Sequence, residues 1–162
     1  MMKRHFFPLA ACLFIFVTNV TLSLSRAEQS TDPTRQRFLG AWRLAWLEEP
    51  GTDGKIHKAD CTGLLVYTAD GHMSVQVMYR NPQTPQAGPV QYAAGGYEAS
   101  YGTFVINDSH TFTFHVEGAL VRSLLGKDLK RVYELSGKQL IVKSPDPNEH
   151  WRVAWERYDS QR

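Results

Sequence analysis

The segment 38–47, with the sequence FLGAWRLAWL, is the feature that most constrains the fold of this chain. Its large apolar residues Trp42, Leu44 and Trp46 recur at every second position, with Arg43 and Ala45 between them. Successive side chains of a β-strand point to opposite faces, so this spacing is typical of a strand with one face on a core. We therefore predict a β-strand over residues 40–48.

Seven further segments have the composition of β-strands and are separated by turn sequences. Asp70-Gly71 lies between two apolar runs, which is a strong hairpin signal. The polar lead-in to the first strand has room for one helical turn, which we place at residues 34–38. The other predicted strands cover residues 62–68, 72–79, 97–106, 111–117, 129–135, 139–143 and 151–158. The expected fold class is therefore all-β.

The connections between these strands alternate in length, and the alternation favours one architecture. Residues 49–61, 80–96 and 118–128 form long connections, and tight turns lie between them. In an up-and-down meander, alternate connections lie at opposite ends, so the long ones share one end and the tight ones the other. We predict an eight-stranded up-and-down antiparallel β-barrel. Its first and last strands pair antiparallel, which places Arg157 on the ring of Trp42 as a structural closure.

The first 27 residues have the organisation of a secretory signal peptide. Basic residues precede an apolar run, and the small residues Ser25 and Ala27 follow it. We predict cleavage after Ala27, which leaves one domain over residues 28–162 in a secreted or periplasmic protein. A transmembrane helix needs about 20 apolar residues, and Pro8 interrupts this run, so we expect no stable membrane anchor.

Cleavage would change the charge balance of the chain. It would remove Lys3, Arg4 and Arg26 and no acidic residue, which leaves fifteen basic residues against sixteen acidic ones, a formal net charge of −1. That balance does not support nucleic-acid binding. Cys61 would be the one remaining cysteine, so no internal disulfide could form. The six histidines are scattered without the spacing of zinc ligands, and we expect neither a metal nor a cofactor.

The order of several short motifs is similar to that of a known family. Gly40-x-Trp42 and Arg157 resemble the pair that seals the closed end of lipocalins, and the closer resemblance is to the bacterial and fungal lipocalin-like domain family. The resemblance extends through residues 40–42, 67–74, 101–103, 115–117, 131–135 and 155–157. Lipocalins bind small apolar molecules inside the barrel, and some barrels of this general kind act as isomerases or cyclases. The resemblance therefore implies a lumen that takes a small hydrophobic molecule.

The side chains that face the lumen are the candidates for that site, because an eight-stranded barrel has room for side chains or one small ligand. Alternation from Trp42 and apolar content predict the following inward side chains: Trp46, Leu65, Tyr67, Met73, Val75, Val77, Tyr79, Tyr97, Tyr101, Tyr133, Leu135, Val153 and Trp155. Of these, the predicted ligand-binding residues are Trp46, Tyr79, Tyr97, Tyr101 and Trp155. Packing alone would account for most of the others.

Two further candidates carry a polar group. Arg131 shares its face with Tyr133 and is predicted to point inward, where a buried guanidinium needs an anionic partner. That partner is Glu98, Glu117 or an acidic group on the ligand. For His115 the alternation indicates the outer face and the family resemblance a characteristic position, so both orientations remain open.

Three functions are compatible with this pattern. The first is a binding protein for a small hydrophobic molecule, with an acidic group of the ligand on Arg131. The second is a cyclase or isomerase without a metal, in which Tyr101 or His115 would donate or accept a proton. The third is a barrel with a filled core that serves as an interaction module. Room for a ligand in the lumen separates the third from the other two.

Overall fold

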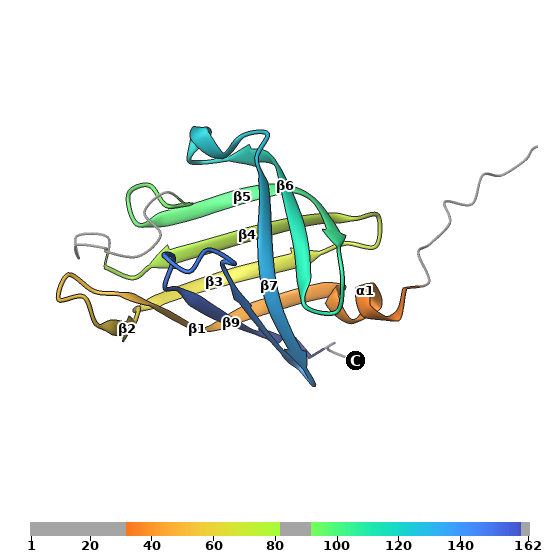
Figure 1. The fold of residues 1–162 in the computed structure, drawn as a ribbon, viewed down its shortest axis with the longest axis horizontal. Helices are drawn as coiled ribbons and strands as arrows, with labels where there is room; N and C mark the ends of the chain where they lie inside the picture. Colours follow the sequence, from red (N-terminus) through yellow and green to blue (C-terminus); the bar gives the residue numbers. More distant parts are fainter. Residues whose placement is uncertain (1–31, 82–91, 160–162) are drawn as a thin grey trace, which may run out of the picture.

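The computed structural model describes residues 32–81 and 92–159, and it is an all-β barrel with one short helix (Figure 1). The elements are α1 (Pro33–Phe38), β1 (Gly40–Pro50), β2 (Ile56–Lys58), β3 (Cys61–Tyr67), β4 (His72–Tyr79), β5 (Tyr97–Ile106), β6 (Thr111–Ala119), the 3-10 turn η2 (Arg122–Leu124), β7 (Asp128–Ser136), β8 (Gln139–Lys143) and β9 (Arg152–Arg157). In the described residues, no helix has the length and apolar character needed to cross a membrane.

Eight of the strands form a closed antiparallel barrel. β1 and β3 to β9 each pair with the next strand along the chain, and β9 returns to β1 with Arg157 opposite Trp42. β6 and β7 cross β3, β4 and β5 at a steep angle (Figure 1), as the twist of a closed sheet requires. The predicted fold class and the up-and-down strand order are confirmed.

The strand order gives the barrel two different ends. One end, the floor, holds the tight turns and α1. The other end, the mouth, holds the long connections, among them β2, which pairs with the last residues of β1 and lies far from α1 in Figure 1. The sequence did not indicate β2, because its three residues are all exposed and show no alternation.

The floor is closed by the helix α1. Asp32 accepts a hydrogen bond from the backbone N–H of Thr34 at 2.8 Å, and Pro33 occupies the first helical position, so the local sequence starts the helix. Phe38 ends the helix and is fully buried. Its ring centroid lies 4.9 to 6.3 Å from those of four surrounding aromatic rings: Tyr67, Phe104, Phe112 and Tyr133.

The first and last strands meet beside this helix. The guanidinium of Arg157 lies 4.3 Å from the centroid of the Trp42 ring, so the predicted closure contact is present. Arg157 also donates hydrogen bonds to the backbone carbonyls of Arg37 and Leu39. The indole N–H of Trp42 donates to the carbonyl of Phe38 at 2.8 Å. The guanidinium and the indole N–H therefore both donate to backbone carbonyls.

A β-bulge in β1 changes which side chains face the lumen. The register with β9 shifts between Leu44 and Trp46, so Leu44 lies opposite Trp155 but Leu47 lies opposite Val153. An extra residue in one strand reverses the alternation beyond it. Leu47 consequently lines the lumen, and Trp46 lies on the outer face.

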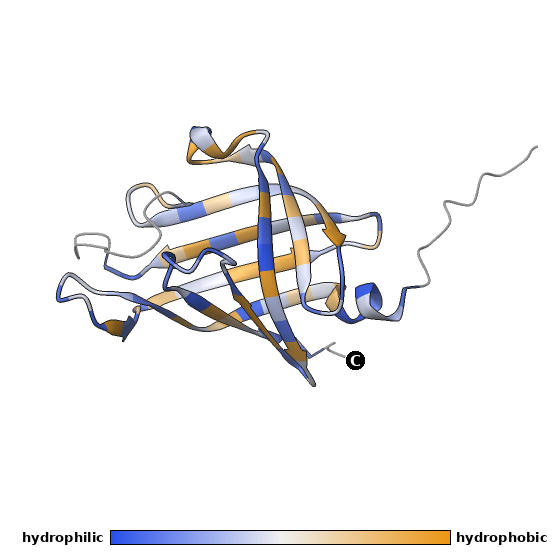
Figure 2. Cartoon of the chain, viewed as in Figure 1, coloured by the Kyte–Doolittle hydropathy of each residue, from blue (hydrophilic) through white to orange (hydrophobic). Residues whose placement is uncertain are grey.

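In the strand β5, the side chains on the inner face are not those that its composition indicated. Its more buried side chains include Ser100 and Phe104, whereas Tyr101 is 57% exposed. Gly102 belongs to the same buried set, and a β-carbon there would lie 1.9 Å from the carbonyl oxygen of His115 in β6. Hydrophobic and hydrophilic residues alternate along the strands in Figure 2, but in β5 the bulky tyrosines are on the outside.

Candidate functional site

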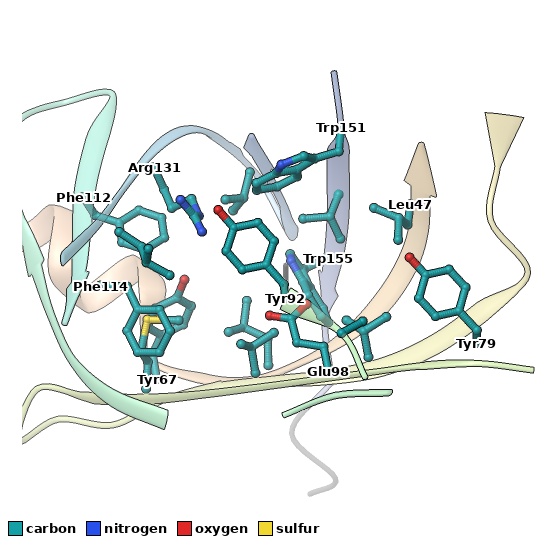
Figure 3. A pocket seen from close by; sticks show the side chains of 18 residues that line it. Leu47, Tyr67, Tyr79, Tyr92, Glu98, Phe112, Phe114, Arg131, Trp151 and Trp155 are labelled. Atoms are coloured by element: carbon teal, nitrogen blue, oxygen red, sulfur yellow. The ribbon is translucent and has the colours of Figure 1, made fainter. Parts of the chain in front are cut away.

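A cavity of about 90 Å³ lies inside the barrel between the floor and the mouth. Its wall is mostly aliphatic and aromatic, and the side chains that line it come from most of the barrel strands (Figure 3). The lining residues are Leu47, Leu65, Tyr67, Met73, Val75, Val77, Tyr79, Tyr92, Ala93, Glu98, Phe112, Phe114, Leu129, Arg131, Val142, Trp151, Val153 and Trp155. The lumen is thus not completely filled by side chains.

Arg131 brings a positive charge into this apolar cavity. β7 supplies the residue, and its guanidinium lies 5.1 Å from the ring centroid of Tyr92 and 5.3 Å from that of Trp151. Such cation–π contacts offset part of the cost of removing the charge from water. One guanidinium nitrogen donates a hydrogen bond to the backbone carbonyl of Lys130 at 2.9 Å. A guanidinium has five N–H donors, so most of its hydrogen-bonding capacity is left for another partner.

Glu98 enters the cavity from β5, on the wall opposite Arg131 in Figure 3. Burial raises the pKa of its carboxyl group to about 7, although the positive charge of Arg131 acts in the opposite direction. Among the described residues, Glu98 forms neither a hydrogen bond nor an ion pair, so its interaction with Arg131 is a longer-range attraction. Glu117, the other predicted partner of Arg131, is exposed.

Tyr67 contributes a third polar group, a hydroxyl without a partner. The side chain comes from β3 and is 2% exposed, and its hydroxyl oxygen is the one buried side-chain polar atom of the described residues that lacks a hydrogen bond. Burial raises the pKa of this phenol, and the charge of Arg131 lowers it. Buried polar atoms are nearly always hydrogen-bonded in proteins, so this hydroxyl is a candidate ligand contact.

A fourth polar contact lies on the mouth side of the cavity. The hydroxyl of Tyr79 donates a hydrogen bond to the carboxylate of Glu49 at 2.7 Å. Glu49 is 7% exposed, and burial raises the pKa of its carboxyl group while the bond from Tyr79 lowers it. Each of these two side chains is therefore the other's hydrogen-bond partner, in contrast to Glu98 and Tyr67.

Three of the seven predicted ligand-binding residues lie on the cavity wall: Tyr79, Arg131 and Trp155. Their positions agree with the alternation along β4, β7 and β9, although their contact with a ligand stays a prediction. The other four predicted residues are Trp46, Tyr97, Tyr101 and His115. None of them lines the cavity.

The inward orientation predicted for Trp46, Tyr97 and Tyr101 is wrong for two different reasons. The bulge in β1 turns Trp46 outward, where Arg152 lies 5.4 Å from its ring centroid. In β5, alternation was counted from the tyrosines, and these are on the outer face: Tyr97 donates a hydrogen bond to the side chain of Gln76 at 3.1 Å, and the ring of Tyr101 covers Gly118.

His115 is on the outer face as well, the orientation that alternation along its strand indicated. Its Nδ1 lies 2.7 Å from the carboxylate of Asp128, and both side chains are exposed. Tyr101 and His115 were the proton donors or acceptors of the enzymatic alternative. Because neither reaches the lumen, that alternative loses the residues on which it was based.

Sequence reasoning missed several residues of the wall. Tyr92 belongs to a connection between strands, where alternation gives no orientation. Trp151 directly precedes β9 and was overlooked, although it shares the phase of Val153 and Trp155 in the predicted strand 151–158. The rings of Tyr92 and Trp151 lie 6.2 Å apart between centroids. Leu47 was missed because the bulge precedes it. Glu98 was considered as a partner for Arg131 but not as a lumen residue, since its neighbours Tyr97 and Tyr101 set the expected phase. Phase counted from Phe104 would have found it.

The arrangement is suited to binding one small molecule. It combines an apolar wall with a few polar groups, which is the usual composition of a small-molecule site. The described residues contain no group of three or more histidine, cysteine, aspartate or glutamate side chains placed to hold a metal ion.

The comparison with protein families agrees with this architecture. The model of the lipocalin-like domain matches residues 39–158. A similar solved structure is that of an uncharacterized protein from Bacteroides eggerthii DSM 20697, with 16% sequence identity, a TM-score of 0.45, and coverage of 75% of this chain and 99% of that chain. The comparison with curated proteins gave no match. The domain and the barrel fold indicate a ligand-binding barrel protein, and the chain belongs to the lipocalin-like domain family.

Proposed function

We propose that this protein binds a small, largely apolar molecule with one acidic group, and that the acid pairs with Arg131 in the barrel lumen. The observation that carries the proposal is the guanidinium of Arg131 in an apolar cavity, held by two aromatic rings and by a single hydrogen bond to a backbone carbonyl. A carboxylate on a guanidinium forms two parallel, charge-assisted hydrogen bonds.

The size of the cavity limits the ligand. About 10–15 Å³ of such volume is needed for one water molecule, so a cavity of about 90 Å³ limits the ligand to roughly ten non-hydrogen atoms. A single aromatic ring with a carboxylate, such as benzoate, is of this size. Long-chain fatty acids would need the side chains around the mouth to move.

The test is a calorimetric titration of benzoate and of methyl benzoate into the protein and into Arg131→Leu. Methyl benzoate keeps the ring and removes the charge. We expect benzoate to bind the unmodified protein at least tenfold more tightly than its ester, since a charge-assisted pair contributes about 1.5 to 3 kcal/mol. The variant Arg131→Leu should bind the two molecules equally.

Arg43→Leu is the matched control, because Arg43 lies on the outer face of β1 and pairs with Glu156 at 2.7 Å. It loses the same charge without touching the cavity, so its preference for benzoate should be unchanged. If benzoate and its ester bind equally well to all three proteins, or if benzoate does not bind, the proposed function is wrong.

We also propose that the protein is exported and that its mature form starts at Glu28. This proposal rests on the signal-peptide organisation of residues 1–27, which lie outside the described residues. Expression in a bacterial host followed by N-terminal sequencing of the periplasmic fraction tests it. A cytoplasmic protein that retains Met1 would contradict it.

A further inference from the structure

The cavity contains more polar groups than an acid on Arg131 requires. Tyr67 and Glu98 also line it, and neither has a hydrogen-bond partner among the described residues. A polar group left without a partner in an apolar cavity destabilises the folded protein. An apolar residue at either position would remove that cost, so the presence of both groups indicates that they contact a ligand.

The hydrogen-bonding chemistry of the three groups divides them into two kinds. Arg131 offers donors only, and the phenol of Tyr67 offers a donor whose environment is positive because of Arg131. An anionic acceptor fits both. Glu98, by contrast, offers an acceptor oxygen in either protonation state. A ligand carboxylate would be repelled by the ionised form and would bond only to the O–H of the protonated form. The group that fits both forms of Glu98 is a hydrogen-bond donor.

The balance of charge indicates that this donor is uncharged. Burial keeps the carboxyl group of Glu98 partly protonated near neutral pH, so it compensates the charge of Arg131 only in part. One ligand carboxylate neutralises that charge. A second, positively charged group on the ligand would restore the imbalance whenever Glu98 is protonated, whereas a hydroxyl group bonds to either form of Glu98.

We propose that the ligand class is a small hydroxylated acid, whose carboxylate is bound by Arg131 and Tyr67 and whose hydroxyl group is bound by Glu98. The proposal rests on the proposed function, which supplies the acid, and adds the second polar group. It also explains why the two unpartnered side chains lie in the same cavity as Arg131. In its simplest form the ligand is an aromatic ring that carries both groups.

The experiment compares the three isomers of hydroxybenzoate with the three matching fluorobenzoates by calorimetry. Fluorine is close to a hydroxyl group in size but cannot donate a hydrogen bond, so the ratio of the two dissociation constants measures the donor alone. We expect at least one hydroxybenzoate isomer to bind about tenfold or more tightly than its fluoro analogue. A site built to hydrogen-bond a hydroxyl group rejects the analogue that lacks it.

Two variants assign the preference to Glu98. Glu98→Leu should bring the ratio for that isomer close to one, and Glu98→Gln, which keeps an acceptor oxygen, should preserve most of it. Arg131→Leu should weaken both members of the pair about equally. The ratio is measured within each protein, so a general loss of affinity in a variant does not alter it.

The outcomes separate this inference from the proposed function. If benzoate binds through Arg131 but no isomer discriminates hydroxyl from fluorine, or if the discrimination survives in Glu98→Leu, the hydroxylated-acid inference is overturned and the proposed function stands. If none of the acids binds, both are overturned.

Discussion

The floor of the barrel and its cavity are built from similar residues but treat their polar groups differently. At the floor, the guanidinium of Arg157 lies on Trp42 and donates to two backbone carbonyls, and the indole N–H donates to a third. In the cavity, the guanidinium of Arg131 lies on two aromatic rings, but Glu98 and Tyr67 have no partner among the described residues.

The difference shows which of the two regions serves stability. A cation on an aromatic ring with all its polar neighbours satisfied contributes to the folded state. Unsatisfied groups beside a partly buried cation cost stability, and proteins retain such groups where a function requires them. We therefore assign the floor to closure of the barrel and the cavity to ligand binding, and the following changes test that assignment.

The largest effect is expected at the floor. Phe38→Ala removes the ring that four aromatic residues surround, so it should lower the free energy of unfolding by about 3 to 5 kcal/mol. Urea unfolding followed by tryptophan fluorescence measures it. The control Val105→Ala alters a side chain that is 63% exposed and should change little. A loss at Phe38 below about 1 kcal/mol would show that α1 does not close the barrel.

A substitution in the cavity should raise the free energy of unfolding instead of lowering it. The pKa of Glu98 rises from the usual 4.5 to about 7 on folding, so the folded protein binds more protons than the unfolded chain between these values. Its stability therefore falls as the pH rises through this window. We expect Glu98→Gln to be more stable than the unmodified protein by about 2 kcal/mol at pH 8 and about equally stable at pH 4.

Unfolding in urea at several pH values, compared between the two proteins, isolates the contribution of Glu98. Other acidic groups titrate in both proteins and cancel in the difference. A difference that is the same at pH 4 and pH 8 would mean that Glu98 is not held in a nonpolar environment in the folded protein.

The closure contact should have an intermediate effect. Arg157→Ala leaves the carbonyls of Arg37 and Leu39 without their donor and removes the cation from Trp42, which should cost about 1 to 3 kcal/mol of unfolding free energy. Arg80→Ala is the control, since Arg80 forms an exposed ion pair with Asp60. Equal stabilities of the two variants would contradict the structural role of Arg157.

The smallest effects are expected for two buried tyrosines that differ in one hydrogen bond. Tyr133 donates to the carbonyl of Asp108 at 3.0 Å, whereas the hydroxyl of Tyr67 has no partner. Tyr133→Phe should therefore lose about 1 kcal/mol, and Tyr67→Phe should lose nothing or become slightly more stable. Thermal unfolding of both variants measures the difference. A similar loss in both would show that Tyr67 has a structural partner.

The sequence predicted the barrel and its closure because those features depend on repeated patterns. Alternation over Trp42 and Leu44 holds up to the bulge, and the pairing of first and last strands follows from the meander alone, so the contact with Arg157 could be predicted. The loop lengths placed the long connections at one end for the same reason. A local irregularity, such as the bulge in β1, changes neither the strand order nor the pairing of the first and last strands.

The residues of the site depended on local detail that the patterns do not contain. A single extra residue in β1 moved Trp46 to the outer face. In β5 the inner face carries Glu98, Ser100 and Gly102, and apolar content therefore indicated the wrong face for Tyr101. Tyr92 contributes to the wall from a connection, where no alternation applies. Arg131 was predicted correctly because β7 has no irregularity near it.

The most direct test of the central claim is where an acidic ligand binds. Protein with labelled methyl groups, titrated with benzoate, reports the location through NMR shifts. We expect the largest shifts at the cavity methyl groups of Leu47, Val77 and Val153, with none at Val105 and Leu120 on the exterior. In Arg131→Leu the same shifts should appear only at a benzoate concentration at least tenfold higher. Shifts confined to exterior methyl groups, or cavity shifts that titrate at the same benzoate concentration in both proteins, would contradict the account.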